Sequence, residues 1–205
     1  MIQDYCRQFN MGGLTADFDR ILIEAEKSEV SYLDYTLELF KAEAGHRERR
    51  NLERRLKVAG LPLSHDLNAY DYGFDNGLQK SRMSQLRELN WLDQIYNIIF
   101  MGPSGTGKTF LAAGLCFDAV QMGYKAYFRT MEQIITTLKM KDFTRSAMAD
   151  YKRLVKAQLI VIDDIMLFPI EKDQAVNFFN FINQLFEKTA KNESEDSSGR
   201  ETNGK

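Results

Sequence analysis

The segment GPSGTGKT at residues 102–109 has the residue types and the spacing of a phosphate-binding loop. Its glycines let the backbone turn so that successive N–H groups face one point, where they bind an anion. A helix predicted to begin near Lys108 directs the positive end of its dipole at the same point. Lys108 supplies a charge for the outer phosphates, and the Thr109 hydroxyl supplies a ligand for Mg²⁺. The segment therefore predicts binding of ATP with Mg²⁺.

The alternative for this segment, a glycine-rich turn with a solvated lysine, does not explain its surroundings. An apolar run of strand length, Tyr96–Met101, precedes it, and a helical pattern through Leu111, Leu115 and Ala119 follows it. A strand, a loop and a helix in this order are what a phosphate-binding loop requires. We name this loop the Walker A motif. The residues predicted to bind the nucleotide are Gly102, Pro103, Ser104, Gly105, Thr106, Gly107, Lys108, Thr109 and Phe110.

An acidic pair, Asp163-Asp164, directly follows the apolar run 159–162, which is typical of a buried parallel strand. In nucleotide hydrolases that have a phosphate-binding loop, an acidic residue at this place holds magnesium, and a neighbour positions water. We therefore predict Asp163 as a metal ligand with Thr109, and Asp164 as the catalytic residue that orients water. A solvent-facing pair at a strand end is the alternative.

Strands and helices alternate over residues 96–187, which predicts an α/β fold with a parallel sheet. A second strand is expected at 125–129. Thr130 and Gln133 are expected to form a capping box at the start of the next helix. Further helices are expected at 146–157 and 171–187. The apolar face of the last helix is predicted to contain Ala175, Phe178, Phe179, Ile182 and Phe186.

Residues 1–95 contain helical patterns and no strong strand pattern. Thr15 is predicted to cap one helix, and Ser31 with Asp34 a second helix that ends at Gly60 and Pro62. The expected organisation is a small all-α domain at 1–69, a linker at 70–95, a P-loop domain at 96–189 and a polar tail at 190–205. The tail has no large apolar residue to bury, so we expect disorder there.

A basic stretch lies on the second of these helices. Residues 41–57 contain seven basic residues (Lys41, Arg47, Arg49, Arg50, Arg54, Arg55, Lys57) and three acidic ones (Glu43, Glu48, Glu53). A basic helix face binds phosphates of DNA, but a solvated face with ion pairs between successive turns is equally natural. The stretch alone does not decide between the two.

The remaining composition excludes several classes of protein. The net charge of -2 gives no bulk argument for nucleic acid or membrane, and no apolar run is long enough to span a bilayer. Two cysteines, Cys6 and Cys116, and two histidines, His46 and His65, form no metal-ligand spacing. Without a visible signal peptide, we expect a cytoplasmic protein. Trp91 precedes the first strand, where it borders the nucleotide base or, more in keeping with its size, packs in the core.

The chain resembles the IstB family of transposition helper ATPases, relatives of the DnaC-type helicase loaders within the AAA+ class. The resemblance covers about residues 5–189, and the order of its segments is more specific than the P-loop alone. The segments that carry it are ERRLKVAGLP (53–62), YDYGFDNGLQKSRMSQLRELNWL (70–92), NIIFMGPSGTGKTFLAAGL (97–115), GYKAYFRT (123–130) and LIVIDDIMLFPI (159–170).

This resemblance implies an AAA+ sheet after a helical domain, ATP-driven assembly of a homo-oligomer on DNA, and stimulation of a partner transposase. The chain departs from the family in two places. Asp164 stands where many AAA+ proteins have glutamate. Beyond the helix at 171–187, the family continues with a sensor strand and an arginine-finger helix, whereas here the polar tail follows.

We therefore expect a truncated family member with impaired hydrolysis. In the AAA+ order the missing strand lies between the strand expected at 96–101, the P-loop strand, and the strand at 159–162 that precedes Asp163-Asp164, the Walker B strand. Either these two strands close up and pair, or the sheet is poorly formed. The other functions left open are a helicase loader, a non-enzymatic fragment that binds DNA or a partner, and a non-functional remnant.

Overall fold

The computed structural model describes residues 1–73, 78–165 and 169–200, except for the side chains of 188–200. The chain forms two compact units, Met1–Lys57 and Val58–Lys205, each of which is described by itself. The second unit includes residues 58–69, which we assigned to the helical domain, and the linker. The domain boundaries expected from the sequence stay a prediction.

The first unit is all-helical, with α1 (Ile2–Gln8), α2 (Gly12–Ser28) and the greater part of α3 (Tyr32–Ala59). Glu43 of α3 is buried and accepts hydrogen bonds from the backbone N–H groups of Gly13 (2.8 Å) and Leu14 (3.2 Å). The expected cap at Thr15 is wrong, because α2 begins three residues earlier and the Thr15 hydroxyl donates to the Met11 carbonyl within the helix. A carboxylate from the facing helix satisfies the free N–H groups instead.

The two ends of α3 agree with the sequence. The Asp34 backbone N–H donates to the Ser31 hydroxyl (3.1 Å), which itself donates to the Asp34 carboxylate (2.7 Å). Gly60 follows the helix with a φ of 75°, a left-handed conformation that glycine adopts without strain. Both predicted boundaries are therefore confirmed.

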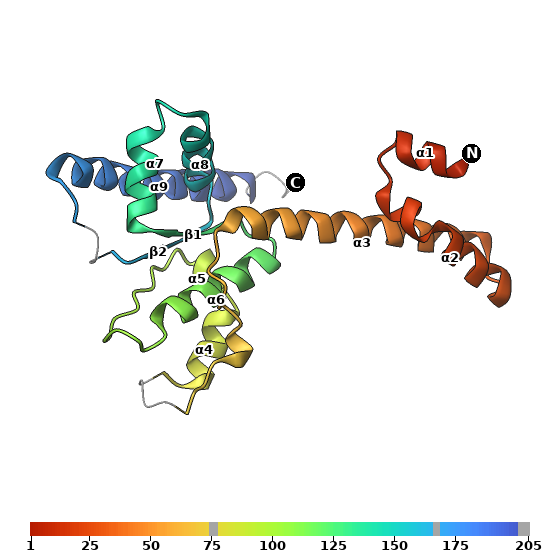
Figure 1. Cartoon of the computed structure of the whole chain (residues 1–205), viewed down its shortest axis with the longest axis horizontal. Coiled ribbons are helices and arrows are strands. Elements are labelled where there is room, and N and C mark those ends of the chain that lie inside the picture. The colour runs from red at the N-terminus through yellow and green to blue at the C-terminus, as the bar shows by residue number, and fades with distance from the viewer. Residues whose placement is uncertain (74–77, 166–168, 201–205) are drawn as a thin grey trace. The chain divides into compact units, whose positions relative to one another are not determined.

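The second unit is built on a two-stranded parallel sheet of β1 (Ala126–Thr130) and β2 (Leu159–Asp163). The register places Thr130 opposite Asp163, so both strands end at one edge. Helix α6 (Lys108–Gln121) contacts both strands, and α7 (Met131–Met140), α8 (Arg145–Val155) and α9 (Lys172–Arg200) lie on the opposite side (Figure 1). The family's α/β class with a parallel sheet is confirmed.

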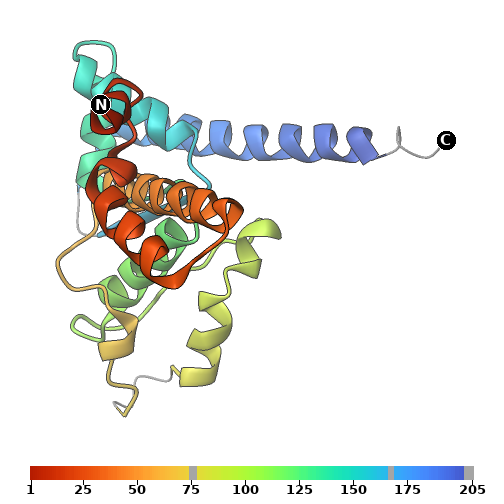
Figure 2. The ribbon, with the colours of Figure 1, turned by 90° about the vertical axis from the view of Figure 1, so that its right-hand side faces the viewer.

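Two apolar clusters hold these layers together. Tyr127 of β1 packs with Ile134, Leu138, Leu154 and Phe181 from the helices α7, α8 and α9. The second cluster contains Leu67, Met83, Leu111 and Leu115. Its elements are η1 (Leu67–Ala69), α4 (Lys80–Arg87) and α6, and a short helix α5 (Asn90–Asp93) follows α4 (Figure 2). The segment called a linker therefore packs against the helix that follows the P-loop.

The strand predicted at 96–101 is not formed. Ile98 and Phe100 are half-buried while Asn97, Ile99 and Met101 are exposed, so the alternation of a strand is present. The sheet of the described residues, however, consists of β1 and β2 alone. A strand needs a neighbour for its backbone N–H and C=O groups, and residues 96–101 have none in that sheet. One of the two expected outcomes was that the P-loop strand and the Walker B strand close up and pair. This pairing is not found in the described residues.

Helix α9 differs from its prediction in two ways. Phe178, Phe181, Ile182 and Leu185 face the core, whereas Phe179 and Phe186 are 63% and 50% exposed. The helix also continues to Arg200, into the range 190–205 for which we expected disorder. Backbone hydrogen bonds of a helix are local, so Lys- and Glu-containing turns form without an apolar face. Residues 201–205 lie outside the described residues, as do 74–77 and 166–168 of the resembling segments.

Candidate nucleotide-binding site

The loop 102–107 has the backbone of an anion cradle. Gly102, Gly105 and Gly107 have φ angles of 154°, 81° and 85°. A Cβ atom added to Gly105 would meet no atom within 4 Å, so the loop is open to solvent at this position. Helix α6 begins at Lys108 and directs the unpaired N–H groups of its first turn at this position. The cradle fits a phosphate chain.

The Lys108 side chain lies across the loop and contacts Pro103. Its ammonium donates to the Pro103 carbonyl at 2.6 Å, and the Thr106 hydroxyl donates to the same oxygen at 3.0 Å. A lysine side chain is flexible, so exchanging this carbonyl for a phosphate oxygen requires no movement of the backbone. Gly102, Pro103, Ser104 and Gly105 are exposed, and a ligand reaches them from solvent.

The structure places the two predicted metal ligands, Thr109 and Asp163, in contact. The Thr109 hydroxyl donates to the Asp163 carboxylate at 3.2 Å, although 54 residues separate them in sequence. Adjacent ligands of an octahedral ion with bonds of ~2.1 Å lie about 3 Å apart, so this oxygen pair fits one Mg²⁺. In the described residues no three His, Cys, Asp or Glu side chains cluster around a common point. Magnesium suits such a sparse set, because it keeps waters and substrate phosphates as ligands.

Asp164 follows β2 with a φ of 56°, in the left-handed region that aspartate tolerates better than most residues. It is exposed, whereas Asp163 is half-buried at the strand end. The change of backbone direction sends the two neighbouring carboxylates to different surroundings. This difference is compatible with two roles, a metal ligand and a group that meets water.

Two aromatic residues pack beside the loop: Phe110, which was predicted to bind the nucleotide, and Tyr70, which was not. The Tyr70 hydroxyl donates to the Thr106 carbonyl at 3.4 Å, and a Cβ atom on Gly107 would lie 2.9 Å from the Tyr70 ring. The Phe110 ring stacks on Tyr70 with centroids 5.7 Å apart. Gly107 is therefore required by close packing as well as by its φ. Tyr70 lies 32 residues before Gly102, so no local pattern in the sequence signals this contact.

The basic stretch of α3 divides into paired and unpaired charges. Lys41 binds Glu38 at 2.8 Å, and Arg47 binds the buried Glu43 at 2.6 Å. Among the described residues, no ion pair involves the exposed side chains of Arg49, Arg50, Arg54 and Lys57. Arg55 is half-buried, and its Nε atom has no hydrogen-bond partner in the part of the chain that the structure describes. Four cations thus remain available to an anionic partner.

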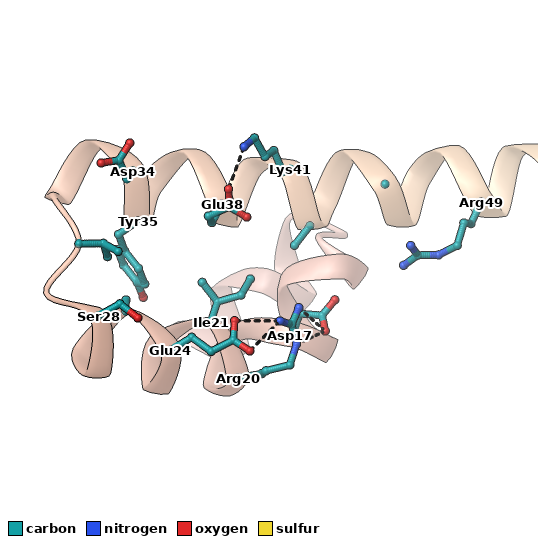
Figure 3. A pocket seen from close by; sticks show the side chains of 14 residues that line it. Asp17, Arg20, Ile21, Glu24, Ser28, Asp34, Tyr35, Glu38, Lys41 and Arg49 are labelled. Carbon is teal, nitrogen blue, oxygen red and sulfur yellow. Dashed lines mark hydrogen bonds and ion pairs between the residues drawn. The ribbon is translucent and has the colours of Figure 1, made fainter.

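A groove of about 480 Å³ lies between α2 and α3, with Arg49 at its rim (Figure 3). Its other basic side chains are paired. Arg20 binds Asp17 (3.2 Å) and Glu24 (3.1 Å), which raises the pKa of its guanidinium, and Lys41 binds Glu38. Among the described residues that line the groove, Arg49 is therefore the basic side chain without an ion pair.

The other residues considered from the sequence are structural. Cys6 and Cys116 are buried free thiols, and burial, opposed by Arg129, raises the pKa of Cys116 to about 12. His46 packs against Gly12, and His65 against Phe117. Trp91 donates its indole N–H to the Leu86 carbonyl at 2.8 Å, in keeping with the core role. In the part of the chain that the structure describes, no helix is long and apolar enough to cross a bilayer.

Comparison with known proteins gives a family that agrees with this site. The model of the family described as IstB-like ATP binding protein matches residues 5–192. A Bacteroides fragilis protein, named for ATP binding and an IS21-like insertion sequence, is 42% identical over 187 residues, covering 91% of this chain and 71% of the relative. A second, from strain YCH46, is 40% identical over 182 residues, covering 89% and 92%. A Pseudomonas aeruginosa protein named for IS21 is 28% identical over 183 residues, covering 89% and 69%. The chain therefore belongs to the family of IstB-like ATP binding proteins.

Proposed function

We propose that this protein binds ATP with Mg²⁺ at the Walker A loop and at Asp163. The observation that carries this proposal is the hydrogen bond between Thr109 and Asp163, which joins the loop to the end of β2. The sequence motif alone does not require these residues to meet. Their contact supplies two oxygens beside the open phosphate cradle, and the names of the relatives point to the same ligand.

Each residue of the site has a separate task in this proposal. The N–H groups of 102–109 and the start of α6 bind the phosphates, and Lys108 neutralises the outer ones. Thr109 and Asp163 hold Mg²⁺, which supplies charge neutralisation when bound. Asp164 orients water. We expect slow hydrolysis, because residues 96–101 lack the ladder that fixes a P-loop, and catalytic groups must be held within about 0.5 Å.

The test is binding of a fluorescent ATP analogue in the presence of Mg²⁺. The unsubstituted chain is expected to bind saturably, and Lys108→Ala to lose the binding. Lys172→Ala, an exposed lysine on α9, serves as the control and is expected to bind as the unsubstituted chain does. Absence of binding in the unsubstituted chain, or equal binding by Lys108→Ala, contradicts the proposal.

We propose further that the protein is a helper in DNA transposition that acts on DNA with a partner transposase and assembles as a homo-oligomer. The four unpaired cations of α3 support contact with DNA phosphates. The relatives are named for insertion sequences, which favours a transposase over a replicative helicase as the partner. A pull-down with each partner in turn distinguishes them, and retention by the helicase alone contradicts this assignment.

A further inference from the structure

Tyr70 contacts the P-loop at the point where the loop passes into helix α6. Its hydroxyl donates to the Thr106 carbonyl at 3.4 Å. Its ring leaves no room for a side chain at Gly107, where a Cβ atom would lie 2.9 Å from a ring carbon. The same ring stacks on Phe110 in the first turn of α6, with centroids 5.7 Å apart. One side chain from outside the motif therefore contacts the loop, its last glycine and the helix that follows.

The segment before this tyrosine is fixed to α6. Leu67 is 2% exposed, and a Cβ atom at Gly114 of α6 would overlap its side chain. Arg87 of α4 donates both to the Asn68 side chain at 2.9 Å and to Asp118 of α6 at 2.7 Å. Helices α4 and α6 accordingly lie side by side (Figure 1). The tyrosine thus extends from a support that is anchored to the helix of the P-loop.

The contact with the Thr106 carbonyl decides where the next N–H group points. The described residues contain no cis peptide bond, and in a planar trans peptide the C=O and the N–H point in opposite directions. Tyr70 packs on the apolar cluster of Leu67 and Leu111, so the carbonyl that it binds faces the interior of the domain. The N–H of the same peptide, which belongs to Gly107, is therefore directed to the open side of the loop. In the part of the chain that the structure describes, it donates to no backbone carbonyl.

This orientation is the one that a phosphate requires. Successive N–H groups that converge on one point bind an anion, whereas a reversed peptide presents a carbonyl oxygen that repels it. Gly105 and Gly107 have φ angles of 81° and 85°. Glycine peptides reverse easily, because no Cβ atom restricts their rotation. The loop therefore depends on an outside contact to select one orientation.

The strand side of the loop does not supply such a contact. Residues 96–101 precede the loop and have no place in the sheet of the described residues. A glycine-rich loop without a strand ladder before it is held chiefly from the helix side. Tyr70 lies on that side.

We propose that Tyr70 is a positioning residue for nucleotide binding, which holds the peptide between Thr106 and Gly107 in the orientation that offers the Gly107 N–H to a phosphate. Tyr70 acts through the loop backbone and touches no atom of the nucleotide. The inference rests on the proposed function, binding of ATP with Mg²⁺, and adds to that site a residue from outside the Walker A motif.

The first test measures the affinity for a fluorescent ATP analogue in the presence of Mg²⁺. Tyr70→Phe removes the hydroxyl and keeps the ring, and it is expected to weaken binding about threefold to tenfold, the usual effect of losing one hydrogen bond. Tyr70→Ala also removes the ring and is expected to bind more weakly still. Tyr72→Phe is the matched control, because its ring lies 4.9 Å from that of Tyr70 but no hydrogen bond joins its hydroxyl to the loop in the described residues. It is expected to bind as the unsubstituted chain does.

Competition with inorganic tripolyphosphate separates positioning of the loop from contact with the base. ATP and tripolyphosphate are each used to displace the fluorescent analogue. Tyr70→Phe is expected to weaken both competitors by the same factor, since the Gly107 N–H meets a phosphate in both. A loss confined to ATP would show that Tyr70 contacts the base or the ribose, and the inference is then wrong.

Nuclear magnetic resonance of the chain labelled at its glycine nitrogens gives a local readout. Without ligand, the Gly107 amide resonance is expected to move or broaden in Tyr70→Phe, because the peptide then samples both orientations. It is expected to return to the position of the unsubstituted chain when the analogue saturates the site. Gly123, beyond the far end of α6, is the control and keeps its resonance. A Gly107 resonance that is unchanged in ligand-free Tyr70→Phe overturns the positioning role.

Failure of the inference and failure of the proposed function give different results. If the unsubstituted chain does not bind the analogue, or if Lys108→Ala binds it equally well, the proposed function falls and the inference falls with it. If the unsubstituted chain binds, Lys108→Ala does not, and Tyr70→Phe binds as tightly as the unsubstituted chain, the ATP site stands and only the role of Tyr70 is wrong.

Discussion

At the scale of single residues, two side-chain oxygens from distant parts of the chain meet beside the P-loop. Thr109 Oγ1 and Asp163 Oδ1 are 3.2 Å apart, whereas Thr106, in the same loop, donates its hydroxyl to Pro103. Two threonines three residues apart therefore have different hydrogen-bond partners. Side-chain type alone does not distinguish them, but the start of α6 directs only Thr109 toward β2.

Thr109→Ala is expected to weaken the Mg²⁺-dependent part of nucleotide binding about tenfold, because one ligand oxygen is lost. Isothermal titration with the ATP analogue, with and without Mg²⁺, measures this part. Thr106→Ala is the matched control and keeps the Mg²⁺ dependence. An equal loss in both variants would show that the loop backbone, rather than the metal, was disturbed.

At the scale of elements, close packing fixes how the segment before the P-loop sits on α6. A Cβ atom at Gly114 of α6 would overlap the side chain of Leu67, which is buried at 2% exposure. Arg87 of α4 reinforces this packing with a 2.7 Å ion pair to Asp118 of α6. Residues 67–87 thus belong structurally with the nucleotide domain.

Gly114→Ala is expected to destabilise the fold by about 1–3 kcal/mol despite the better helix propensity of alanine, because Leu67 has to move. Gly45→Ala provides the contrast. Its added Cβ meets only an Arg49 side-chain atom at 3.7 Å, so it is expected to stabilise by about 0.5–1 kcal/mol. Urea denaturation measures both, and a stabilising Gly114→Ala would refute the packing interpretation.

The contact between α2 and α3 depends on the charge of Glu43. Burial raises the pKa of this carboxyl, but hydrogen bonds from Arg47, Leu14 and Gly13 outweigh burial and hold it below the ordinary value of 4.5. The stabilisation is therefore complete above the ordinary pKa and is lost as the pH falls through the lower pKa of the folded state.

Glu43→Gln is expected to cost about 1–3 kcal/mol at neutral pH, since it weakens hydrogen bonds to a charged acceptor. The deficit relative to the unsubstituted chain is expected to shrink as the pH falls below 4.5. Thermal denaturation at several pH values measures it. Glu48→Gln, exposed on the same helix, is the control. A deficit independent of pH would rule out the charge as its cause.

At the scale of the whole molecule, the sheet consists of β1 and β2 in the described residues, and the segment before the P-loop has no place in it. Phe100 of this segment still packs against the cluster of Leu67 and Leu111. Apolar contact therefore positions the segment, while its backbone groups lack ladder bonds. A loop that is supported on one side only has more conformational freedom than a catalytic site tolerates.

Hydrogen exchange of the full chain tests this arrangement. Amides at 97–101 are expected to exchange within the shortest labelling time, whereas the buried helix residues Leu111–Ala119 are expected to be protected. Mass spectrometry of peptides that cover the two segments gives the comparison. Protection of 97–101 equal to that of α6 would show that the segment has a strand partner.

Local signals in the sequence were sufficient for much of the chain. The capping box of Thr130 and Gln133, the strands 125–129 and 159–162 and the helix after the P-loop were all predicted, because short-range patterns specify them. The glycine positions and Lys108 followed from the motif for the same reason. Family membership followed from the order of these segments.

Tertiary structure decided what depends on partners that are distant in the sequence. Glu43 replaced Thr15 at the start of α2, and residues 96–101 kept the alternation of a strand without becoming one. Phe179 and Phe186 share the helical period of the core residues but face solvent, since the sheet and α7 cover only one side of α9. The helical period of apolar residues in a sequence indicates that one face of the helix is apolar. Only the assembled elements determine whether another surface is there to cover it.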